Sequence, residues 1–560
     1  MNWPLLVYPA IFLLLVLLPA PVIGRYIYWL MEHPSFKGES VLLKLCGIRE
    51  HSDKTWRSYL ISLLLLNLIG CVVLLVMLMC QKFLPFNPSH IPGMSFPMAL
   101  NTAISFVTNT NWQSYNGATA LSAFSQMVGL TVQNFLSAAS GIAVAIVLFR
   151  SLKRRTQGCE TTLGLFGQDL IRICFGLLLP LSFILALILV SQGVPQTFHS
   201  LIQIHSIDSS SIQHLTLGPV ASQEAIKQIG TNGGGYYGAN SAYPLENPTA
   251  FTNWLEMISI LLIPAALVCT YGEYIGNRKH SFTILVSMSV LLVLGLGVSL
   301  WQQTANDPAL LHLSSSSGLW EGIESRFGVV LSTIWGTATS AASNGSVNAM
   351  LDSFSPFAGM VALMNILSGE VIFGGVGSGI YGMLLFVILT VFLCGLMVGH
   401  TPTYLGKPLS LDVMKWVILT MLIMPVGVLL LGGLSICLPD ISQVIGVSGP
   451  HGLTRLLYAY ASTSGNNGSA FGGFNAANSL QEYLLSVAMI LGRYGMMIPV
   501  LIIAGHFVNA KHIAVGAGEF PIHGPLFSFL LMSCIVLIGM LAFLPVLILG
   551  PIAEFLQGVM

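Results

Sequence analysis

Apolar residues occupy most of the chain in long runs that are separated by short polar or charged segments. Ten runs have about the twenty residues that a helix needs to cross the roughly 30 Å hydrocarbon core of a bilayer. They lie near residues 3–23, 58–81, 125–149, 171–191, 254–276, 282–301, 380–399, 414–437, 484–507 and 526–550. This pattern predicts an all-α polytopic membrane protein with about ten transmembrane helices and a single transmembrane domain, 1–560.

Four connections between these runs show a second pattern. Each contains a moderately apolar stretch of about ten residues, too short to span a bilayer, which leads into a small, polar, uncharged cluster. The four segments are MALNTAISFVTNTNWQ (98–113), PVASQEAIKQIGTNGGGYYG (219–238), FGVVLSTIWGTATSAASNGSV (327–347) and LTRLLYAYASTSGNNGSAFGG (453–473). One Asn-Gly pair alone is typical of an ordinary turn. Four such clusters in the same setting instead predict four re-entrant pore hairpins on one side of the membrane.

The clusters recur about every 110 to 125 residues, and a regular period of this kind indicates internal repeats. Each hairpin with its flanking spans forms a span–hairpin–span unit, which predicts repeats at 58–150, 169–277, 281–399 and 414–507. Residues 1–57, a span and a cytoplasmic loop, and residues 526–560, a last span, are additions to the four repeats.

The polar clusters are the candidate cation site. The candidate ligands are Asn109, Thr110 and Asn111; Thr231, Asn232 and Gly233; Ser343, Asn344 and Gly345; and Asn466, Asn467 and Gly468. Gln113 and Gly234 are expected at the mouth. The first cluster lacks the Asn-Gly pair, so that Asn111 corresponds either to Asn232 or to Gly233.

These residue types suit a dehydrated monovalent cation. Backbone carbonyls can replace the hydration shell of the ion without a fixed negative charge that would bind it too tightly. Glycine reaches the backbone conformations that turn successive carbonyls inward, and Asn, Ser and Thr side chains bond the neighbouring amides. The clusters contain no Asp or Glu, which disfavours a divalent site with carboxylate ligands.

Composition and charge exclude other classes of protein. Of the 560 residues, 54% are hydrophobic and only 8% are charged, against about a quarter charged in ordinary globular chains, which excludes a soluble enzyme. The formal net charge of +0 argues against a nucleic-acid partner. If the N-terminus faces outward, the inward loops hold 16 of the 21 Lys and Arg residues. This positive-inside bias predicts a multi-pass protein with both termini extracytoplasmic.

A gate is a further hypothesis. Gly374, Gly375, Gly377, Gly379 and Gly382 crowd the start of the seventh span, where each glycine costs a helix about 1 kcal/mol. We expect the helix to break there, although glycines also permit close helix packing. Arg493 lies within the ninth span and needs carbonyls or a carboxylate. It is expected to contact the break beneath the hairpins, with Glu370 as a competing partner. Glu224 and Lys227 are interpreted as solvated flank charges.

The sequence contains no complete nucleotide-binding motif. Ser52-Asp53-Lys54-Thr55 begins like the phosphorylated loop of P-type pumps, but Trp56 and Arg57 follow it. Gly406-Lys407 lacks the upstream glycine of a phosphate loop, and GGVGSG (374–379) lacks a βαβ setting. We therefore expect no nucleotide to bind this chain.

Several long motifs carry a family resemblance: VTNTNWQSY (107–115), GTNGGGYYGANSAYPLENP (230–248), TSAASNGSVNAM (339–350), TPTYLGK (401–407), STSGNNGSAFGG (462–473) and GRYGMMIPV (492–500). With them, essentially the whole chain resembles the potassium-binding A subunits of Kdp potassium-transporting ATPases, within a superfamily of K⁺ transporters.

The resemblance implies a potassium-selecting, non-catalytic subunit in the bacterial inner membrane. It implies three kinds of partner: a P-type ATPase, the B subunit, which hydrolyses ATP and receives the ion, and the small C and F subunits. His400 departs from the family pattern, where Arg is expected before TPTYLGK. Two alternatives stay open, a stand-alone Trk- or Ktr-like channel or symporter and a secondary transporter with broken helices.

Overall fold

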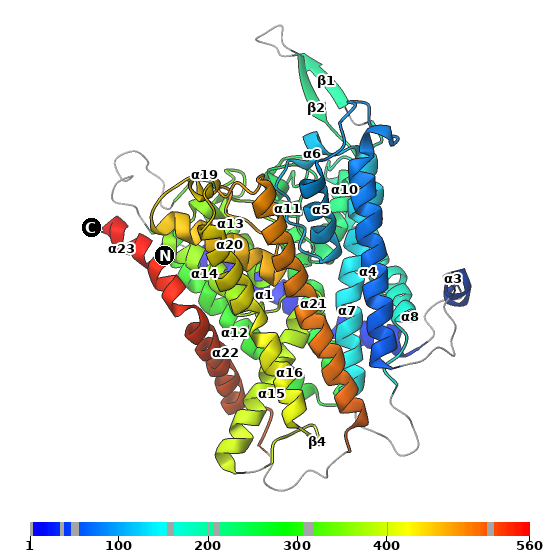
Figure 1. Ribbon diagram of the computed structural model, residues 1–560, viewed down its shortest axis with the longest axis vertical. Coiled ribbons are helices and arrows are strands. Elements are labelled where there is room, and N and C mark those ends of the chain that lie inside the picture. The colour runs from blue at the N-terminus through cyan, green and yellow to red at the C-terminus, as the bar shows by residue number, and fades with distance from the viewer. Residues whose placement is uncertain are drawn as a thin grey trace.

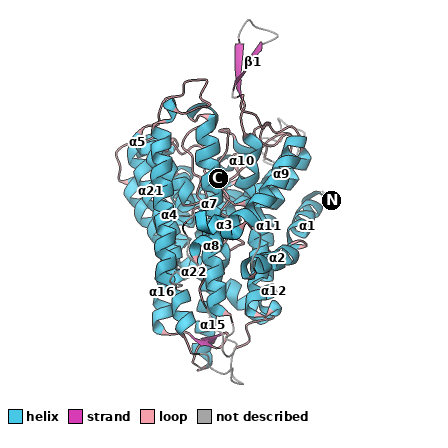
Figure 2. Cartoon of the chain, turned by 90° about the vertical axis from the view of Figure 1, so that its right-hand side faces the viewer, coloured by secondary structure: helices cyan, strands magenta, loops and turns pink. Residues whose placement is uncertain are grey.

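The computed structural model describes residues 4–33, 38–45, 47, 55–153, 162–199, 201–205, 212–305, 319–399, 401–511 and 520–559. Within these residues the chain is a bundle of long, roughly parallel helices with little strand (Figures 1 and 2). Ten helical segments are long and apolar enough to cross a membrane. Each coincides with one of the ten predicted runs, so the predicted fold class is confirmed.

Nine of the ten spans are single helices or helices continued through a π-helical turn, and the first span consists of two α-helices in succession. They are α1 (Pro4–Leu17) with α2 (Ala20–Glu32); α4 (Trp56–Met79); η2 (Ser125–Thr131) with α7 (Val132–Leu152); α8 (Phe166–Ile171), η3 (Arg172–Leu178) and α9 (Leu179–Ser191); α11 (Ala250–Ile275); α12 (Arg278–Gln303); α15 (Ser378–Val398); α16 (Leu411–Met421), α17 (Ile423–Pro425), η6 (Val426–Leu431) and α18 (Gly432–Ile436); α21 (Ser479–Asn509); and α22 (Pro525–Leu547), η7 (Ile548–Ile552) and α23 (Ala553–Val559).

Shorter elements fill the space between the spans. Five short helices are α5 (Phe96–Val107), α10 (Val220–Ile229), α13 (Gly328–Ala341), α14 (Pro356–Leu367) and α20 (Pro450–Gly465). The smallest helical turns are α3 (Glu39–Leu45), η1 (Gln81–Phe83), α6 (Gly117–Ala120), η4 (Asn240–Ala242), η5 (Leu351–Ser353) and α19 (Ile441–Ile445). Strands β1 (Leu201–His205) and β2 (Ile212–Thr216) form an antiparallel hairpin that protrudes from one end of the bundle (Figure 1), and β3 (Thr403–Tyr404) pairs with β4 (Lys407–Pro408).

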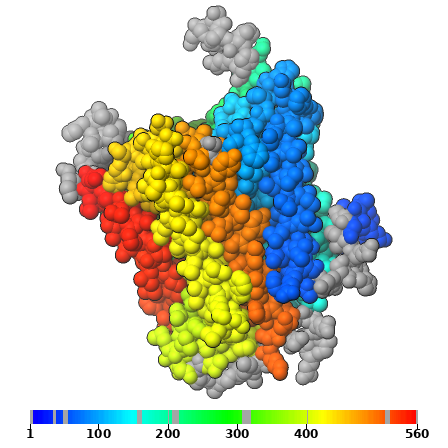
Figure 3. Space-filling view, in the orientation of Figure 1, coloured from blue at the N-terminus to red at the C-terminus, as the bar shows by residue number. Residues whose placement is uncertain are grey.

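The helices sort into a buried centre and an apolar outer surface. Nearly all of the side chains of α7 and most of those of α11 are buried, and α7 carries small polar residues, such as Asn134 and Ser137, among its apolar ones. By contrast, α4 and α22 expose many leucine, isoleucine and valine side chains. In Figure 3 these two helices lie on the outer face, with α16 and α21 between them. Continuous apolar exposure over this length is the surface that lipid requires.

The third hairpin is followed by a broken helix rather than by one span. Helix α14 was not predicted from the sequence; it ends at Leu367, and α15 begins at Ser378. The chain between them is irregular, with Gly374 and Gly377 at φ +66° and +90°. The predicted break therefore exists, but it precedes the spanning helix instead of interrupting it.

A side-chain clasp ties the end of the chain to the fourth hairpin. His451, at the start of α20, contacts Asp352 Oδ1 at 3.2 Å and Glu554 Oε1 at 2.9 Å. Arg455 donates to both oxygens of Asp352, at 2.9 and 2.6 Å. Hydrogen bonding to the two carboxylates raises the pKa of His451 to about 9, so the imidazole of His451 is protonated and positively charged at neutral pH.

Candidate ion-binding site

Four short helices, α5, α10, α13 and α20, each end in a non-helical loop, and the four loops meet. We call their four-residue cores, 109–112, 231–234, 343–346 and 466–469, the ring. The first residue of each core has a positive φ: 64° at Asn109, 44° at Thr231, 53° at Ser343 and 57° at Asn466. A left-handed residue at this point ends the helix and turns the chain back, which is how a short helix becomes a hairpin.

The third residue of each core also has a positive φ. The angle is 53° at Asn111, 77° at Gly233, 76° at Gly345 and 89° at Gly468. The same backbone pattern therefore runs through all four loops. It aligns Asn111 with Gly233 and Thr110 with Asn232, which decides between the two registers left open for the first repeat. Asparagine can stand for glycine here because it is among the few other residues that visit this conformation.

The glycines allow each loop to touch the next. A Cβ at Gly233 would lie 1.7 Å from the Asn344 carbonyl oxygen, one at Gly345 would lie 2.5 Å from that of Asn467, and one at Gly468 would lie 1.9 Å from that of Thr110. Each third-position glycine thus packs on the second-position carbonyl of the following loop. No other residue could occupy these positions without displacing that carbonyl.

Hydrogen bonds close the circle. Loop one donates to loop two through Asn109 Nδ2 and the Thr231 oxygen, at 2.9 Å. The third hairpin joins the second through Asn344 Nδ2 and the Lys227 oxygen at 3.2 Å, and joins the fourth through Ser343 Oγ and the Asn466 oxygen at 2.9 Å. The fourth returns to the first, with Asn466 Nδ2 donating to Thr110 Oγ1 at 2.9 Å. The ring is therefore cyclic, in chain order.

The second residue of three cores is an asparagine: Asn232, Asn344 and Asn467. Each of these side chains donates a hydrogen bond to the preceding hairpin, and in the described part of the chain the main-chain oxygens of the same residues accept none. Nδ2 of Asn232 donates to Asn109 Oδ1 at 2.6 Å, and Nδ2 of Asn467 donates to the Thr339 and Ser340 oxygens and, at 2.9 Å, to Glu370 Oε1. Within the described residues, no hydrogen bond is accepted by the main-chain oxygens of Thr110, Asn232, Asn344 and Asn467. These four residues are fully buried, so a buried set of four carbonyl oxygens is free to bind an ion.

Helix α7 braces the ring from behind, which the sequence pattern did not reveal. Asn134 Oδ1 accepts from Asn111 Nδ2 at 2.7 Å, and Ser137 Oγ donates to Asn109 Oδ1 at 2.8 Å. Both residues lie in a long apolar run. The signal that could have revealed them is the presence of two polar residues one turn apart on a spanning helix.

The interpretation of Glu224 and Lys227 as solvated charges is wrong. Both side chains are buried, and Lys227 Nζ lies 2.5 Å from Glu224 Oε2 and 2.7 Å from Glu246 Oε2. Burial alone would lower the pKa of Lys227, but the attraction of the two carboxylates outweighs it and raises the pKa. Glu246 Oε1 in turn accepts from the Tyr237 amide at 2.7 Å. The cluster therefore fixes the second hairpin to the chain that follows its loop.

A wide vestibule opens on one side of the ring. The cavity has a volume of about 810 Å³ and is lined by residues of all four loops, including Asn111, Gly234, Gly345 and Gly468. Gln113 also lines it, and its Oε1 accepts from the Gly235 amide at 2.8 Å. Gln113 therefore both lines the mouth and braces the first loop against the second.

The glycine-rich segment lies against the other side of the ring. The Val376 amide donates to Thr231 Oγ1 at 2.9 Å, and the Gly374 amide donates to the Ala341 oxygen at 2.9 Å. A Cβ at Gly375 would lie 3.2 Å from Ser343 Cβ. Gly379 and Gly382 lie within the first turns of α15.

Arg493 is buried beside this segment but does not bond its carbonyls in the way the gate hypothesis expects. Its Nη2 donates to the Ser137 oxygen at 2.6 Å, and a Cβ at Gly141 would meet both Arg493 Nη2 and the Val376 oxygen. Arg493, Glu370 and Tyr381 line one small cavity of about 20 Å³, and no ion pair joins Arg493 to Glu370 in the described part of the chain. His400 lies outside the described residues.

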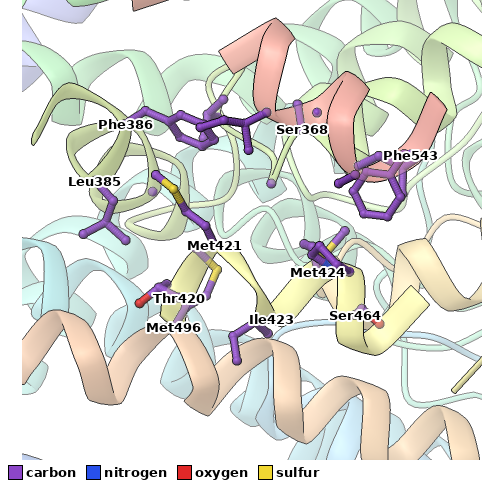
Figure 4. Close-up of a pocket in the computed structure, with 18 residues that line it drawn as sticks. Ser368, Leu385, Phe386, Thr420, Met421, Ile423, Met424, Ser464, Met496 and Phe543 are labelled. Atoms are coloured by element: carbon purple, nitrogen blue, oxygen red, sulfur yellow. The ribbon is translucent and has the colours of Figure 1, made fainter. Parts of the chain in front are cut away.

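Another cavity, of about 60 Å³, shares the lining residues Gly369, Met424 and Met496 with the cavity of about 20 Å³ beside Arg493. Figure 4 shows mainly carbon and sulfur side chains around it, and its polar side chains are those of Ser368, Thr420 and Ser464. The lining of this cavity therefore offers few polar ligands compared with the ring.

Comparisons with known proteins show to which family the chain belongs. Residues 10–556 match the family described as Potassium-transporting ATPase A subunit. A relative from Pseudomonas aeruginosa is 51% identical over 554 residues and one from Escherichia coli O157:H7 is 46% identical over 553 residues, each match covering 98% of both chains. Both are named Potassium-transporting ATPase potassium-binding subunit.

A solved structure shares the fold at much lower sequence similarity. The crystal structure of the potassium transporter TrkH from Vibrio parahaemolyticus matches with a TM-score of 0.50 and 15% identity, covering 90% of this chain and 98% of that one. This likeness supports the membrane-helical fold, independently of the sequence relatives.

Proposed function

The chain belongs to the potassium-transporting ATPase A subunit family, and we propose that it selects and binds K⁺ for an ATP-driven, high-affinity import complex. The observation that carries this proposal is the ring, in which Thr110, Asn232, Asn344 and Asn467 present four buried main-chain oxygens that no hydrogen bond of the described chain uses. Main-chain carbonyl oxygens of this kind can replace water around a monovalent cation.

The chemistry behind the ring favours a singly charged ion. The Glu370 carboxylate accepts from the Asn467 amide behind the loop, and the ring itself contains no acidic residue. Divalent cations prefer several carboxylate oxygens, whereas carbonyl rings bind K⁺ without trapping it. The proposed ligands are those predicted from the sequence, with the second-position carbonyls foremost, and Gln113 and Gly234 at the mouth.

We further propose the division of the chain into four repeats at 58–150, 169–277, 281–399 and 414–507. The common pattern of two positive-φ residues in each loop supports this division. The positive-inside bias supports a topology with the vestibule and both termini on the extracytoplasmic side of the inner membrane. K⁺ then enters the ring from the outside.

The energy must come from a partner, since the chain carries no ATP-hydrolysing motif in its sequence. The names of the relatives imply an ATPase complex, and we propose that its pump is a P-type ATPase, the B subunit, accompanied by the small C and F subunits. This chain is then a non-catalytic subunit of a translocase. We also propose that the 374–382 segment and Arg493 form a gate beneath the ring, because the segment bonds Thr231 directly and lies against Ser343.

Reconstitution tests the proposal against a stand-alone channel or symporter. Vesicles that contain the whole complex should take up K⁺ only with ATP, and a variant of the pump subunit that cannot be phosphorylated should abolish uptake. Vesicles with this chain alone should show no K⁺ flux. Passive K⁺ flux through the isolated chain would instead favour the Trk-like alternative, and ATP hydrolysis that is indifferent to K⁺ would contradict both.

A further inference from the structure

A groove separate from the ring runs along the membrane-facing flank formed by α2, α11 and α12, which lie side by side in Figure 2. Its volume is about 620 Å³. Helix α12 exposes Phe282, Val293 and Leu294 along it, with Phe282 65% exposed. Since α11 and α12 are long and apolar enough to span the membrane, the groove opens toward lipid.

The lining is apolar along its length and charged at one end. Nine of the fourteen lining residues are apolar, among them Leu17, Pro21, Leu285 and Val290, and two are serines. The other three are Arg25, Glu273 and Arg278. Glu273 lies two residues before the end of α11, and Arg278 is the first residue of α12, so the charges gather at the turn between these helices.

The charged end carries an excess of positive charge. Arg278 Nη2 lies 2.9 Å and Arg25 Nε lies 3.6 Å from Glu273 Oε1, so that two guanidinium groups share one carboxylate. The arginine side chains are 65% and 60% exposed, and the exposed Lys279 follows directly. Cationic side chains at the end of an apolar surface attract the anionic headgroups of the cytoplasmic leaflet.

The dimensions fit a single acyl chain. From Phe282 to Leu294 the helix rises about 18 Å, at 1.5 Å per residue, which compares with about 15 Å for one leaflet of a 30 Å hydrocarbon core. A phospholipid suits the groove because the lining is apolar over this length and ends in an excess of positive charge, which matches an acyl chain that carries an anionic headgroup.

We propose that this groove binds one anionic phospholipid, with an acyl chain along α12 and the phosphate at the exposed sides of the Arg25 and Arg278 guanidinium groups. The lipid would seal the flank where the α1–α2 pair packs against α11. The inference concerns this flank alone and does not depend on which ion the ring selects.

Native mass spectrometry of the intact complex tests the site, after exchange into nanodiscs of equal phosphatidylglycerol and phosphatidylcholine. The wild-type complex should retain one more phosphatidylglycerol than the double variant Arg25→Gln/Arg278→Gln. Each cation near an anionic membrane is worth a factor of about five, so the retained ratio of the two lipids should fall by about 30-fold. Arg25→Lys/Arg278→Lys, which keeps the charge, should restore most of it.

Two further variants make the test specific. Lys415→Gln removes an exposed cation outside the groove and should leave lipid retention unchanged. Ser289→Trp fills the groove without altering its charge and should also expel the lipid; if the arginine double variant does not assemble, this variant decides. Equal phosphatidylglycerol retention in wild type and Ser289→Trp would overturn the proposal. A cross-link from Val290→Cys to another polypeptide would also overturn it, because it would show that a partner covers the groove.

Discussion

Replacement of Gly233 by alanine should damage the ring through its neighbour rather than through its own loop. The new Cβ would stand 1.7 Å from the Asn344 carbonyl oxygen, where ordinary contact begins at 3.4 Å. The oxygen must therefore move by about 1.7 Å, the difference between these two distances. At the proposed site, a carbonyl displaced this far would no longer reach an ion held by its three counterparts.

The expected loss follows from two terms. One ligand to a charged group is worth about 1.5–3 kcal/mol, which corresponds to a roughly 10- to 150-fold weaker K⁺ affinity at 1.4 kcal/mol per factor of ten. The left-handed backbone of Gly233, with φ +77°, costs alanine a further 1–2 kcal/mol or so in stability. Gly233→Asp and Gly345→Asp should have at least this effect, because they add a carboxylate to the same collision.

The assay is the K⁺ dependence of ATP hydrolysis by the purified complex. The half-activating K⁺ concentration should rise at least about tenfold in Gly233→Ala, while the ATP dependence stays unchanged. Gly276→Ala is the matched control: Gly276 has a similar φ of +65°, at the end of α11, and nothing lies within 4 Å of its added Cβ. It should show the backbone cost in thermal stability with normal K⁺ activation.

A half-activating concentration within about twofold of wild type for an assembled Gly233→Ala complex would refute the reasoning. It would mean that the Asn344 oxygen does not bind the ion or that the ring yields without loss. An equal shift in Gly276→Ala would also refute it, since the effect would then come from general strain.

Three other changes test other parts of the molecule. Asn467→Asp should weaken K⁺ over Na⁺ discrimination by about tenfold, measured as the ratio of half-activating concentrations, because the new carboxylate would face Glu370 in place of an amide donor worth about 1.5 kcal/mol. Lys227→Met should destabilise the complex by about 3–5 kcal/mol in thermal unfolding, since it leaves two buried carboxylates unpaired; Lys415→Met, which breaks an exposed pair, should cost under about 1 kcal/mol. His451 has a folded pKa of about 9, above its unfolded value of about 6.5, so its clasp should stabilise fully below about pH 6.5 and be lost as the pH rises through about 9. The melting temperature of wild type should therefore fall over this range, and that of His451→Gln should not; parallel pH profiles would contradict the clasp.

The spans and the hairpins could be predicted from the sequence because both depend on simple lengths. A run of about twenty apolar residues crosses the bilayer and a run of about ten cannot, so the ten spans and the four polar clusters could be identified by reading along the chain. The register of the first loop could not. Asn111 and Asn232 are the same residue type, and only the positive φ of Asn111 shows that its position in the loop corresponds to that of Gly233.

Burial of charge was the part that local pattern could not show. Lys227 reads as a surface residue because its helix also carries Glu224 and Gln228, but its second partner, Glu246, lies 19 residues further along the chain. The cost of burying one ammonium group is offset only when such distant groups converge. The roles of Asn134 and Ser137 could not be predicted either, because their hydrogen-bond partners, Asn111 and Asn109, lie in a loop that only the folded structure brings against α7.

The direction of the contacts in the ring has a consequence for selectivity. The second-position asparagines are anchored on the preceding hairpin, as Asn344 is on the Lys227 oxygen, and the carbonyls of Asn344 and Asn467 rest on Gly233 and Gly345 of the preceding loops. The positions of these carbonyls therefore depend on the hairpin before them as well as on their own loop. Because the four loops close into a circle, the spacing of the oxygens is a property of the whole ring. We therefore expect the proposed ring to resist collapse onto a smaller ion, because an asparagine that moved inward would strain its hydrogen bond to the preceding hairpin.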